Sequence, residues 1–233
     1  MISTKDVGGD NTGGGLSKTI GPGEHVLKIN GIKLTRFPFM ETDKGYYLAL
    51  EVETKPIEGF EGFFRDINDE SKGRYEGQVG EVKTNRYYYK DGTTPSGIDI
   101  SRDTEIVKAV RKVCFAADRY DWFEEADGQH ETIEDFIDAF NKSDVFKDKY
   151  FKMCVAGKEY EKKNGYTAFD LYLPKLTGKE VVNIELESTK KSRLIPYDTA
   201  NHMIKLEPKE VSSFGDDMEN ASFDVKNNTD FDL

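Results

Sequence analysis

The stretch QVGEVKTNRYYYK, from Gln78 to Lys90, combines three consecutive tyrosines with several basic residues. Successive side chains of a β-strand point to opposite faces of the sheet. Taken as one strand, the stretch places Arg86, Tyr88 and Lys90 on one face and the other two tyrosines on the opposite face. One face can then pack on a core while the other presents a ring between two cations, although aromatic residues also favour strands for packing reasons alone.

The strand expected upstream of this stretch has two alternating halves that are out of phase. Leu27 and Ile29 alternate correctly, as do Ile32 and Leu34. A one-residue slip at Asn30-Gly31 reconciles the two halves, because glycine favours a β-bulge or a sharp bend. We therefore expect one long first strand that is bent in its middle.

Other strands and helices follow from the same periodicities. Alternating apolar residues predict strands, apolar residues at i, i+3 and i+4 predict helices, and Asn164-Gly165 between two strand patterns predicts a tight hairpin. The expected strands after the first are 46–52, 60–66, 78–90, 150–156, 166–173 and 181–186, and the expected helices run from Asp103 to about Tyr120 and from Thr132 to Asn141.

Three or four strands, then helices, then a hairpin is an order typical of the small barrels that bind oligonucleotides or oligosaccharides. We predict a mainly β protein with an OB-fold-like five-stranded antiparallel barrel and helices between the third and fourth strands. The barrel domain is expected at residues 21–206, with a helical insert at about 103–147. Residues 1–20 are expected to form a flexible arm and residues 207–233 a disordered acidic tail.

Charge and composition narrow the function classes. The net charge of −11 argues against a polyanionic partner, but Glu207 to Leu233 alone holds eight acidic residues against two lysines, so the body is less acidic than the whole.

No apolar run reaches the ~20 residues that cross a bilayer, and we expect no secretory signal at the N-terminus. Cys114 and Cys154 lie far apart in the sequence and form no ligand cluster with histidine, so we expect neither a metal nor another cofactor. Two such cysteines are typical of a reducing compartment, so we expect a cytoplasmic protein.

Cations and aromatic rings recur along the predicted strands and at their hairpin ends. Rings can stack unpaired bases while cations follow the phosphate backbone, which is the chemistry of single-strand binding. If the barrel forms, these residues can converge on one groove. The candidate nucleic-acid-binding residues are Lys33, Arg36, Phe37, Phe39, Arg65, Arg86, Tyr88, Lys90, Lys158, Tyr160, Lys162, Lys163 and Tyr166.

The C-terminal residues Asp230, Phe231, Asp232 and Leu233 combine acidic groups with two apolar side chains. Such a tail could occupy the protein's own groove as a mimic of a phosphate backbone, or dock on a basic pocket of a partner protein. An ordinary solubilising terminus is the third alternative. The sequence leaves these three open.

Two other functions compete with single-strand binding. A virion structural or packaging component would use the barrel for protein contacts. A metal-dependent nuclease is suggested by Glu53 and Lys55, whose spacing with Asp43 upstream occurs in such sites. Short matches of this kind arise often by chance in a chain rich in Glu and Lys, so a non-enzymatic role is expected.

The chain resembles bacteriophage single-stranded-DNA-binding proteins. The likeness lies in Pro22-Gly23-Glu24-His25 before the first strand, in the segment from Lys44 to Val52, and in the acidic tail with its terminal hydrophobic residue. The resemblance implies non-specific coating of single-stranded DNA during DNA replication, recombination and repair in the cytoplasm of a host cell. It also implies replication or recombination proteins as partners of the tail; assembly into a homo-oligomer is left open.

Overall fold

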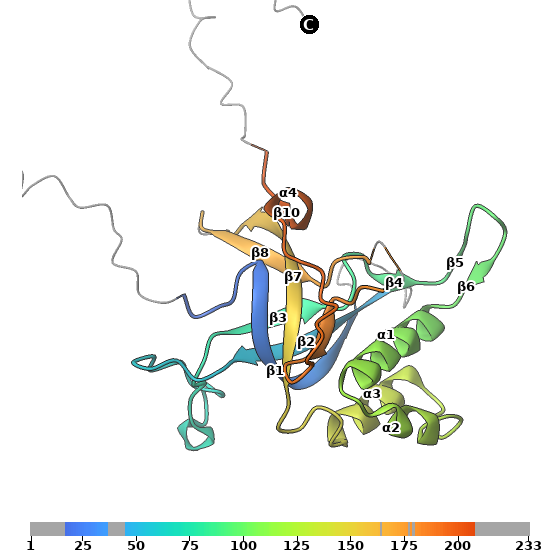
Figure 1. Ribbon diagram of the computed structural model, residues 1–233, viewed down its shortest axis with the longest axis horizontal. Coiled ribbons are helices and arrows are strands. Elements are labelled where there is room, and N and C mark those ends of the chain that lie inside the picture. The colour runs from blue at the N-terminus through green and yellow to red at the C-terminus, as the bar shows by residue number, and fades with distance from the viewer. Residues whose placement is uncertain (1–16, 37–44, 164, 177, 179, 208–233) are drawn as a thin grey trace, which may run out of the picture.

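The computed structural model describes residues 17–36, 45–163, 165–176, 178 and 180–207 (Figure 1). A curved sheet occupies the centre, and three of the four α-helices of this part of the chain pack together beside it. Residues 1–16 and 208–233, which make up most of the predicted arm and tail, lie outside the described residues, as do Phe37 and Phe39.

Five strands close into a ring. β1 (Gly23–Arg36) pairs with β2 (Gly45–Thr54), β2 with β3 (Val79–Lys83), β3 with β8 (Thr167–Tyr172), β8 with β7 (Tyr150–Glu161), and β7 returns to β1. The prediction of an all-antiparallel barrel is wrong in one pairing, because β3 and β8 run parallel and pair only at Val82–Leu171 and Lys83–Tyr172. The sheet is therefore mixed, and its ring is closed least firmly at this point.

The bend predicted in the first strand is present. The register of β1 against β2 shifts between Ile29 and Gly31, so Asn30 is the extra residue of a bulge. The bulge brings both apolar pairs of the strand to the same core, where Leu27, Ile29 and Ile32 are all buried. The first half of β1 can pair with β7 while the second half pairs with β2.

Two predicted strands differ from the structure. The stretch from Gln78 to Lys90 is not one strand: β3 ends at Lys83, residues 84–87 form a bend, and β4 (Tyr89–Lys90) pairs separately with Gly45 and Tyr46. The segment 60–66 is not a strand either, and only Phe64 forms an isolated bridge, with Arg74. It belongs to the β2–β3 loop, residues 55–78, which includes a short 3₁₀ turn, Glu70–Lys72.

Both predicted helices are present, and a short third one lies between them. α1 (Arg102–Ala116) begins one residue before the predicted start at Asp103, and its cap is Ser101, whose side chain accepts a hydrogen bond from the Thr104 amide. α3 (Ile133–Lys142) is capped in the same way by Thr132. The additional helix is α2 (Tyr120–Glu125). All three helices lie between β3 and β7 in the chain, the third and fourth strands of the ring.

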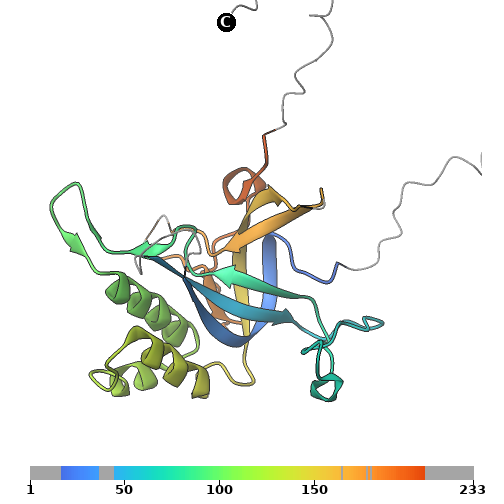
Figure 2. The same cartoon turned by 180° about the vertical axis from the view of Figure 1, so that it is seen from behind.

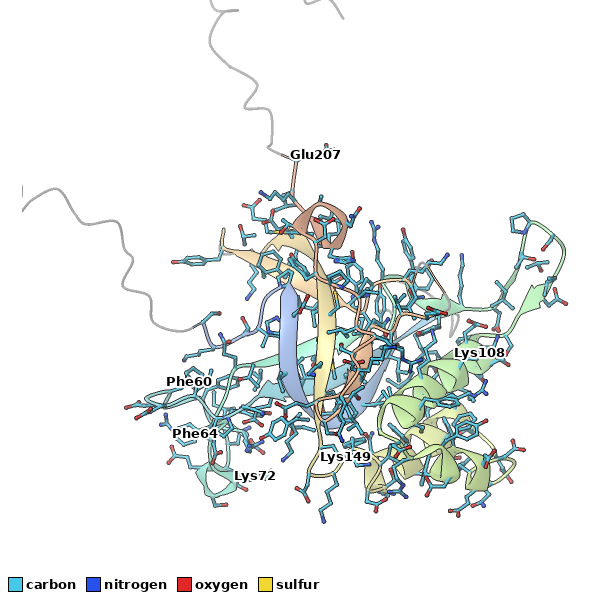
Figure 3. The ribbon with its side chains drawn as sticks, in the orientation of Figure 1. Phe60, Phe64, Lys72, Lys108, Lys149 and Glu207 are labelled. Carbon is cyan, nitrogen blue, oxygen red and sulfur yellow. The ribbon has the colours of Figure 1, made fainter. Side chains whose placement is uncertain are left out.

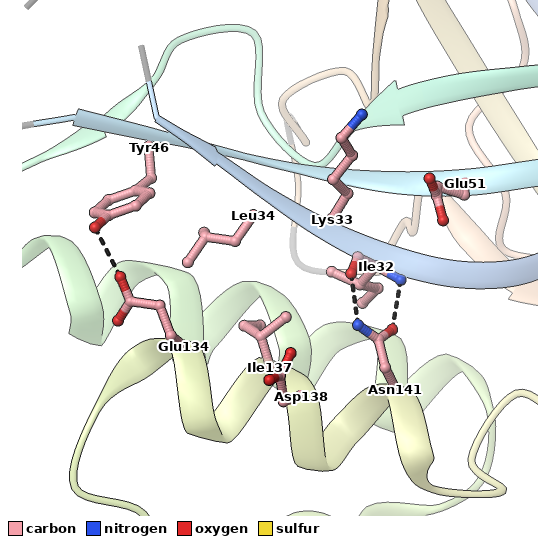
Figure 4. A pocket seen from close by; sticks show the side chains of 9 residues that line it. All are labelled: Ile32, Lys33, Leu34, Tyr46, Glu51, Glu134, Ile137, Asp138 and Asn141. Carbon is pink, nitrogen blue, oxygen red and sulfur yellow. Dashed lines mark hydrogen bonds between the residues drawn. The ribbon is translucent and has the colours of Figure 1, made fainter. Parts of the chain in front are cut away.

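Helix α1 packs against β2, β4 and β9 (Ile184–Leu186), and α3 packs against β1. Asn141 on α3 accepts a hydrogen bond from the Ile32 amide and donates one to the Ile32 carbonyl, both at 2.7 Å, and so replaces a neighbouring strand at this edge (Figure 4). Tyr46 donates to Glu134 at 2.8 Å further along α3. Between these contacts lies a hollow of about 380 Å³ with an acidic rim.

The remaining elements extend the sheet. β5 (Gly92–Thr93) and β6 (Asp99–Ile100) form a small separate hairpin. After β8, β9 (Ile184–Leu186) pairs with β7, in agreement with the strand predicted at 181–186. The chain then forms α4 (Thr199–His202) and β10 (Met203–Ile204), which also pairs with β7, although the sequence there gave no pattern.

Candidate functional site

A groove of about 810 Å³ opens where β3 and β8 diverge. The two strands stay paired only at the end of β3, so their other halves separate and leave a gap between Gly80 on β3 and Phe169 on β8. Figure 2 shows β3 and β8 close together at their arrowhead ends and apart at their other ends. The groove is lined by Ser17, Thr19, Ile20, Gly21, Gln78, Gly80, Glu81, Lys83, Lys158, Tyr160, Lys162, Thr167, Ala168, Phe169, Asp170 and Leu171.

The segment from Ser17 to Gly21 forms one wall of this groove. Thr19 makes a parallel bridge to Val79 on β3, and the Ile20 amide donates to the Val79 carbonyl at 3.0 Å. The Ile20 side chain is buried beneath β3, where Gly80 leaves it room. Three residues of the segment predicted to be a flexible arm, Ser17, Thr19 and Ile20, therefore contribute to the site.

The opposite wall carries the cations of the β7–β8 hairpin. Lys158 and Lys162 line the groove together with Tyr160, whose side chain is 43 % exposed. Lys163 and Tyr166 lie at the tip of the same hairpin and are exposed, Tyr166 to 73 %. The predicted residues of this hairpin are thus brought together, and three of them face the groove.

A second group, which we call the tyrosine cluster, consists of Tyr47, Tyr87 and Tyr88 with Lys83, Arg86 and Lys90. Tyr47 on β2 meets Tyr88 edge to face, with ring centroids 6.2 Å apart. Each cation lies over a ring: Lys83 is 3.8 Å from the centroid of Tyr47, Arg86 5.2 Å from that of Tyr87, and Lys90 5.7 Å from that of Tyr88.

The three consecutive tyrosines have different environments. Tyr87 is 63 % exposed, Tyr88 is half-buried against Tyr47, and Tyr89 is buried at 9 % exposure. Tyr89 bonds through its hydroxyl to Thr84 at 2.9 Å, and burial raises its pKa. The predicted alternation of faces therefore does not hold, because the chain bends between β3 and β4.

Lys83 joins the tyrosine cluster to the groove. It covers the ring of Tyr47 on one side and lines the groove on the other. Its Nζ atom also lies 2.7 Å from Oδ1 of Asp170 on β8. The pairing register places Lys33, Ala49 and Lys83 in one row across β1, β2 and β3.

Other predicted residues do not converge on the groove. Lys33 lies on the same face of the sheet, but its Nζ atom is paired with Glu81 at 2.9 Å. Arg65 lies over Tyr75 in the β2–β3 loop and pairs with Glu53 at 3.3 Å. Arg36 is part of β1 opposite Tyr46. Phe37, Phe39 and the tail residues Asp230, Phe231, Asp232 and Leu233 are outside the part of the chain that is described.

Tyr47, Lys83 and Asp170 were not predicted to be site residues. Tyr47 and Lys83 occur in predicted strands at positions that alternate with core residues, which was a usable signal for outward-facing side chains. Asp170 gave no signal, because its place beside Lys83 depends on a pairing between residues 87 apart in the chain.

Glu53, the centre of the nuclease alternative, is 5 % exposed and has three hydrogen-bond donors around its carboxylate. Asn30 and Arg65 donate from their side chains, and Glu76 donates from its amide at 2.9 Å. A metal ion would have to displace these donors. Within the described residues no cluster of three or more His, Cys, Asp or Glu is arranged to hold a metal ion.

In the described part of the chain no helix has the length and apolarity needed to cross a bilayer.

Comparison with known proteins returns no matching family model, no matching curated protein and no matching solved structure.

Proposed function

We propose that this protein binds single-stranded DNA in the groove between β3 and the β7–β8 hairpin, on a barrel of the oligonucleotide-binding type. The ring order β1-β2-β3-β8-β7 and the helices between β3 and β7 support this architecture. Barrels of this type bind their ligands on the second and third strands and on the loops after the first and fourth. Among the described residues those elements are β2, β3 and the tip of the β7–β8 hairpin.

One observation carries the proposal: cations and exposed rings from distant parts of the chain border the same groove. Lys83 lines one side, with its Nζ atom over the ring of Tyr47, and Lys158, Tyr160 and Lys162 line the other. A base stacked on an aromatic ring contributes about 1–3 kcal/mol, and cations beside it bind the backbone without reading sequence. A few such contacts are enough for useful non-specific affinity.

The exposed rings favour single strands over duplexes. Tyr87, Tyr160 and Tyr166 each offer an accessible ring, from 43 to 73 % exposed. The bases of a duplex are already stacked on their neighbours, so only unpaired bases can use these rings.

The proposed biological role follows from the proposed binding of single-stranded DNA. A protein that coats exposed strands would act in DNA replication, recombination and repair, as the resemblance to phage single-strand binders implies. The acidic residues 207–233 would then either compete with DNA for the groove or bind replication proteins. Contacts between bound copies would allow a homo-oligomer along the strand.

The proposal is tested by fluorescence anisotropy with a labelled oligothymidine and the matched duplex at two salt concentrations. We expect the single strand to bind more tightly than the duplex and to weaken as salt rises. Tyr160→Ala should weaken binding by about 1–3 kcal/mol. The control is Phe115→Ala, which removes a ring that is 57 % exposed but lies on α1, away from the groove-lining residues. Absence of binding at low salt, or equal losses in the two variants, would refute the proposal.

A further inference from the structure

An ion pair crosses the groove at the point where β3 and β8 separate. Lys83 is the last residue of β3, and Asp170 precedes the short segment of β8 that pairs with β3. The Nζ atom of Lys83 lies 2.7 Å from Oδ1 and 2.9 Å from Oδ2 of Asp170. The lysine side chain is 20 % exposed and the aspartate side chain 39 %, so the pair is partly shielded from solvent.

Asp170 is placed among the groups that would receive the ligand. In the β7–β8 register it lies directly opposite Lys158. Burial, and after it the negative charge of Asp170, raises the pKa of Tyr47 in the tyrosine cluster. A carboxylate at this position repels a phosphate backbone and at the same time occupies one of the cations that line the groove.

We propose that Asp170 is a built-in competitor of the nucleic-acid backbone, which holds Lys83 in an ion pair that a phosphate must break. The proposal rests on the function proposed above and assigns Asp170 the control of affinity at the same site. A phosphate that binds Lys83 replaces one anionic partner by another, and leaves Asp170 without its cation. Part of the favourable free energy of the new contact is therefore offset.

The competition has a thermodynamic signature that a purely structural ion pair lacks. A cation that is free before binding takes up a phosphate and releases condensed counterions into the solution. A cation that is already neutralised by a carboxylate adds little to that release. The wild-type protein should therefore show a weaker dependence of affinity on salt than its number of cations implies.

The test is Asp170→Asn, measured by anisotropy with oligothymidine over a range of salt concentrations. The amide keeps the size of the side chain and removes its charge, so Lys83 becomes available. We expect binding to tighten by roughly three- to tenfold at low salt, and the slope of log K against log salt to steepen by about 0.7, the value for one additional phosphate contact on a single strand.

The matched control is Asp66→Asn. Asp66 also pairs with a lysine, Lys72, at 2.6 Å, but both lie in the β2–β3 loop and neither lines the groove. Figure 3 places Lys72 on the projection that carries Phe60 and Phe64, on the other side of the molecule from Lys108 of α1. Asp66→Asn should leave both affinity and slope unchanged.

A double-mutant cycle distinguishes competition between Asp170 and phosphate from a purely structural ion pair that holds β3 and β8 together. In a Lys83→Gln background, Asp170→Asn should have a much smaller effect on affinity and none on the slope. Thermal unfolding of all variants reports any loss of structure independently. If Asp170→Asn binds no more tightly than wild type with an unchanged slope, or acts equally in the Lys83→Gln background, the inference is overturned. Failure of the wild-type protein to bind single strands would instead overturn the proposed function.

Discussion

Asn30 donates a hydrogen bond from Nδ2 to Oε2 of Glu53 at 3.1 Å, and so ties the bulge of β1 to the end of β2. The same carboxylate accepts from Arg65 and from the Glu76 amide, both in the β2–β3 loop. One buried acidic side chain thus fixes three separate parts of the chain relative to one another.

Replacement of Glu53 should lower stability rather than abolish a reaction. Glu53→Ala leaves the Glu76 amide and the Asn30 side chain without their acceptor, and we expect a loss of roughly 1–3 kcal/mol in the free energy of unfolding. Urea denaturation measures the loss. Glu51→Ala, at an exposed position of the same strand, should stay within about 0.5 kcal/mol of wild type. A stable Glu53→Ala protein that fails only in magnesium-dependent cleavage would contradict this structural role.

Gly80→Ala should displace the N-terminal segment from Ser17 to Gly21, which forms one wall of the groove, from its place against β3. An added Cβ would lie 2.7 Å from Cγ1 of the buried Ile20. Overpacking of this kind costs about 1–3 kcal/mol, which a urea titration detects. The double variant with Ile20→Ala should lose less than the sum of the two single variants, because the clash is relieved. Gly92→Ala, where nothing lies within 4 Å of the added Cβ, is the control; additivity of the two changes would argue against a shared contact.

Deletion of residues 207–233 distinguishes two roles of the acidic tail. If the tail competes for the groove, the truncated protein should bind oligothymidine more tightly, most clearly at low salt, because the attraction between tail and groove is screened by ions. Anisotropy at two salt concentrations measures this. Unchanged affinity would remove self-competition and leave docking on a partner protein as the role of the tail.

Neither cysteine should react in the folded protein. Cys114 and Cys154 are free and buried, and burial raises their pKa to about 12 and about 11. The reactive thiolate is therefore scarce even at pH 9, where exposed thiols are largely ionised. Iodoacetamide followed by mass spectrometry should show modification only after unfolding in urea. Rapid labelling of either residue under native conditions at pH 8 would show that the interior is open to solvent.

Local features of the structure could be predicted, whereas contacts between distant segments could not. The phase change between Leu27–Ile29 and Ile32–Leu34 predicted the bulge, because alternation is a property of a few consecutive residues. The apolar stripes of α1 and α3 predicted both helices for the same reason. The break after Lys83 was missed, because the residues that follow continue to read as strand and their bend depends on the pairing of Tyr89 with Tyr46.

The residues of the candidate site likewise divide into those that a local pattern predicts and those that depend on contacts between distant segments. The hairpin residues Lys158, Tyr160 and Lys162 were predicted because the Asn-Gly turn places them at one tip. The Lys83–Asp170 pair was not, since it requires the parallel pairing of β3 with β8 across the whole helical insert. No local pattern in the sequence encodes that pairing.

The short contact between β3 and β8 has a consequence for how a polymer could enter. β1 and β2 pair from Leu27 to Arg36 on both sides of the bulge, whereas β3 and β8 share only two residue pairs, so the ring has a seam that is already half open. A sealed tunnel would accept only a chain threaded from a free end. A lateral slot admits the middle of a long or circular molecule directly, and releases it in the same direction.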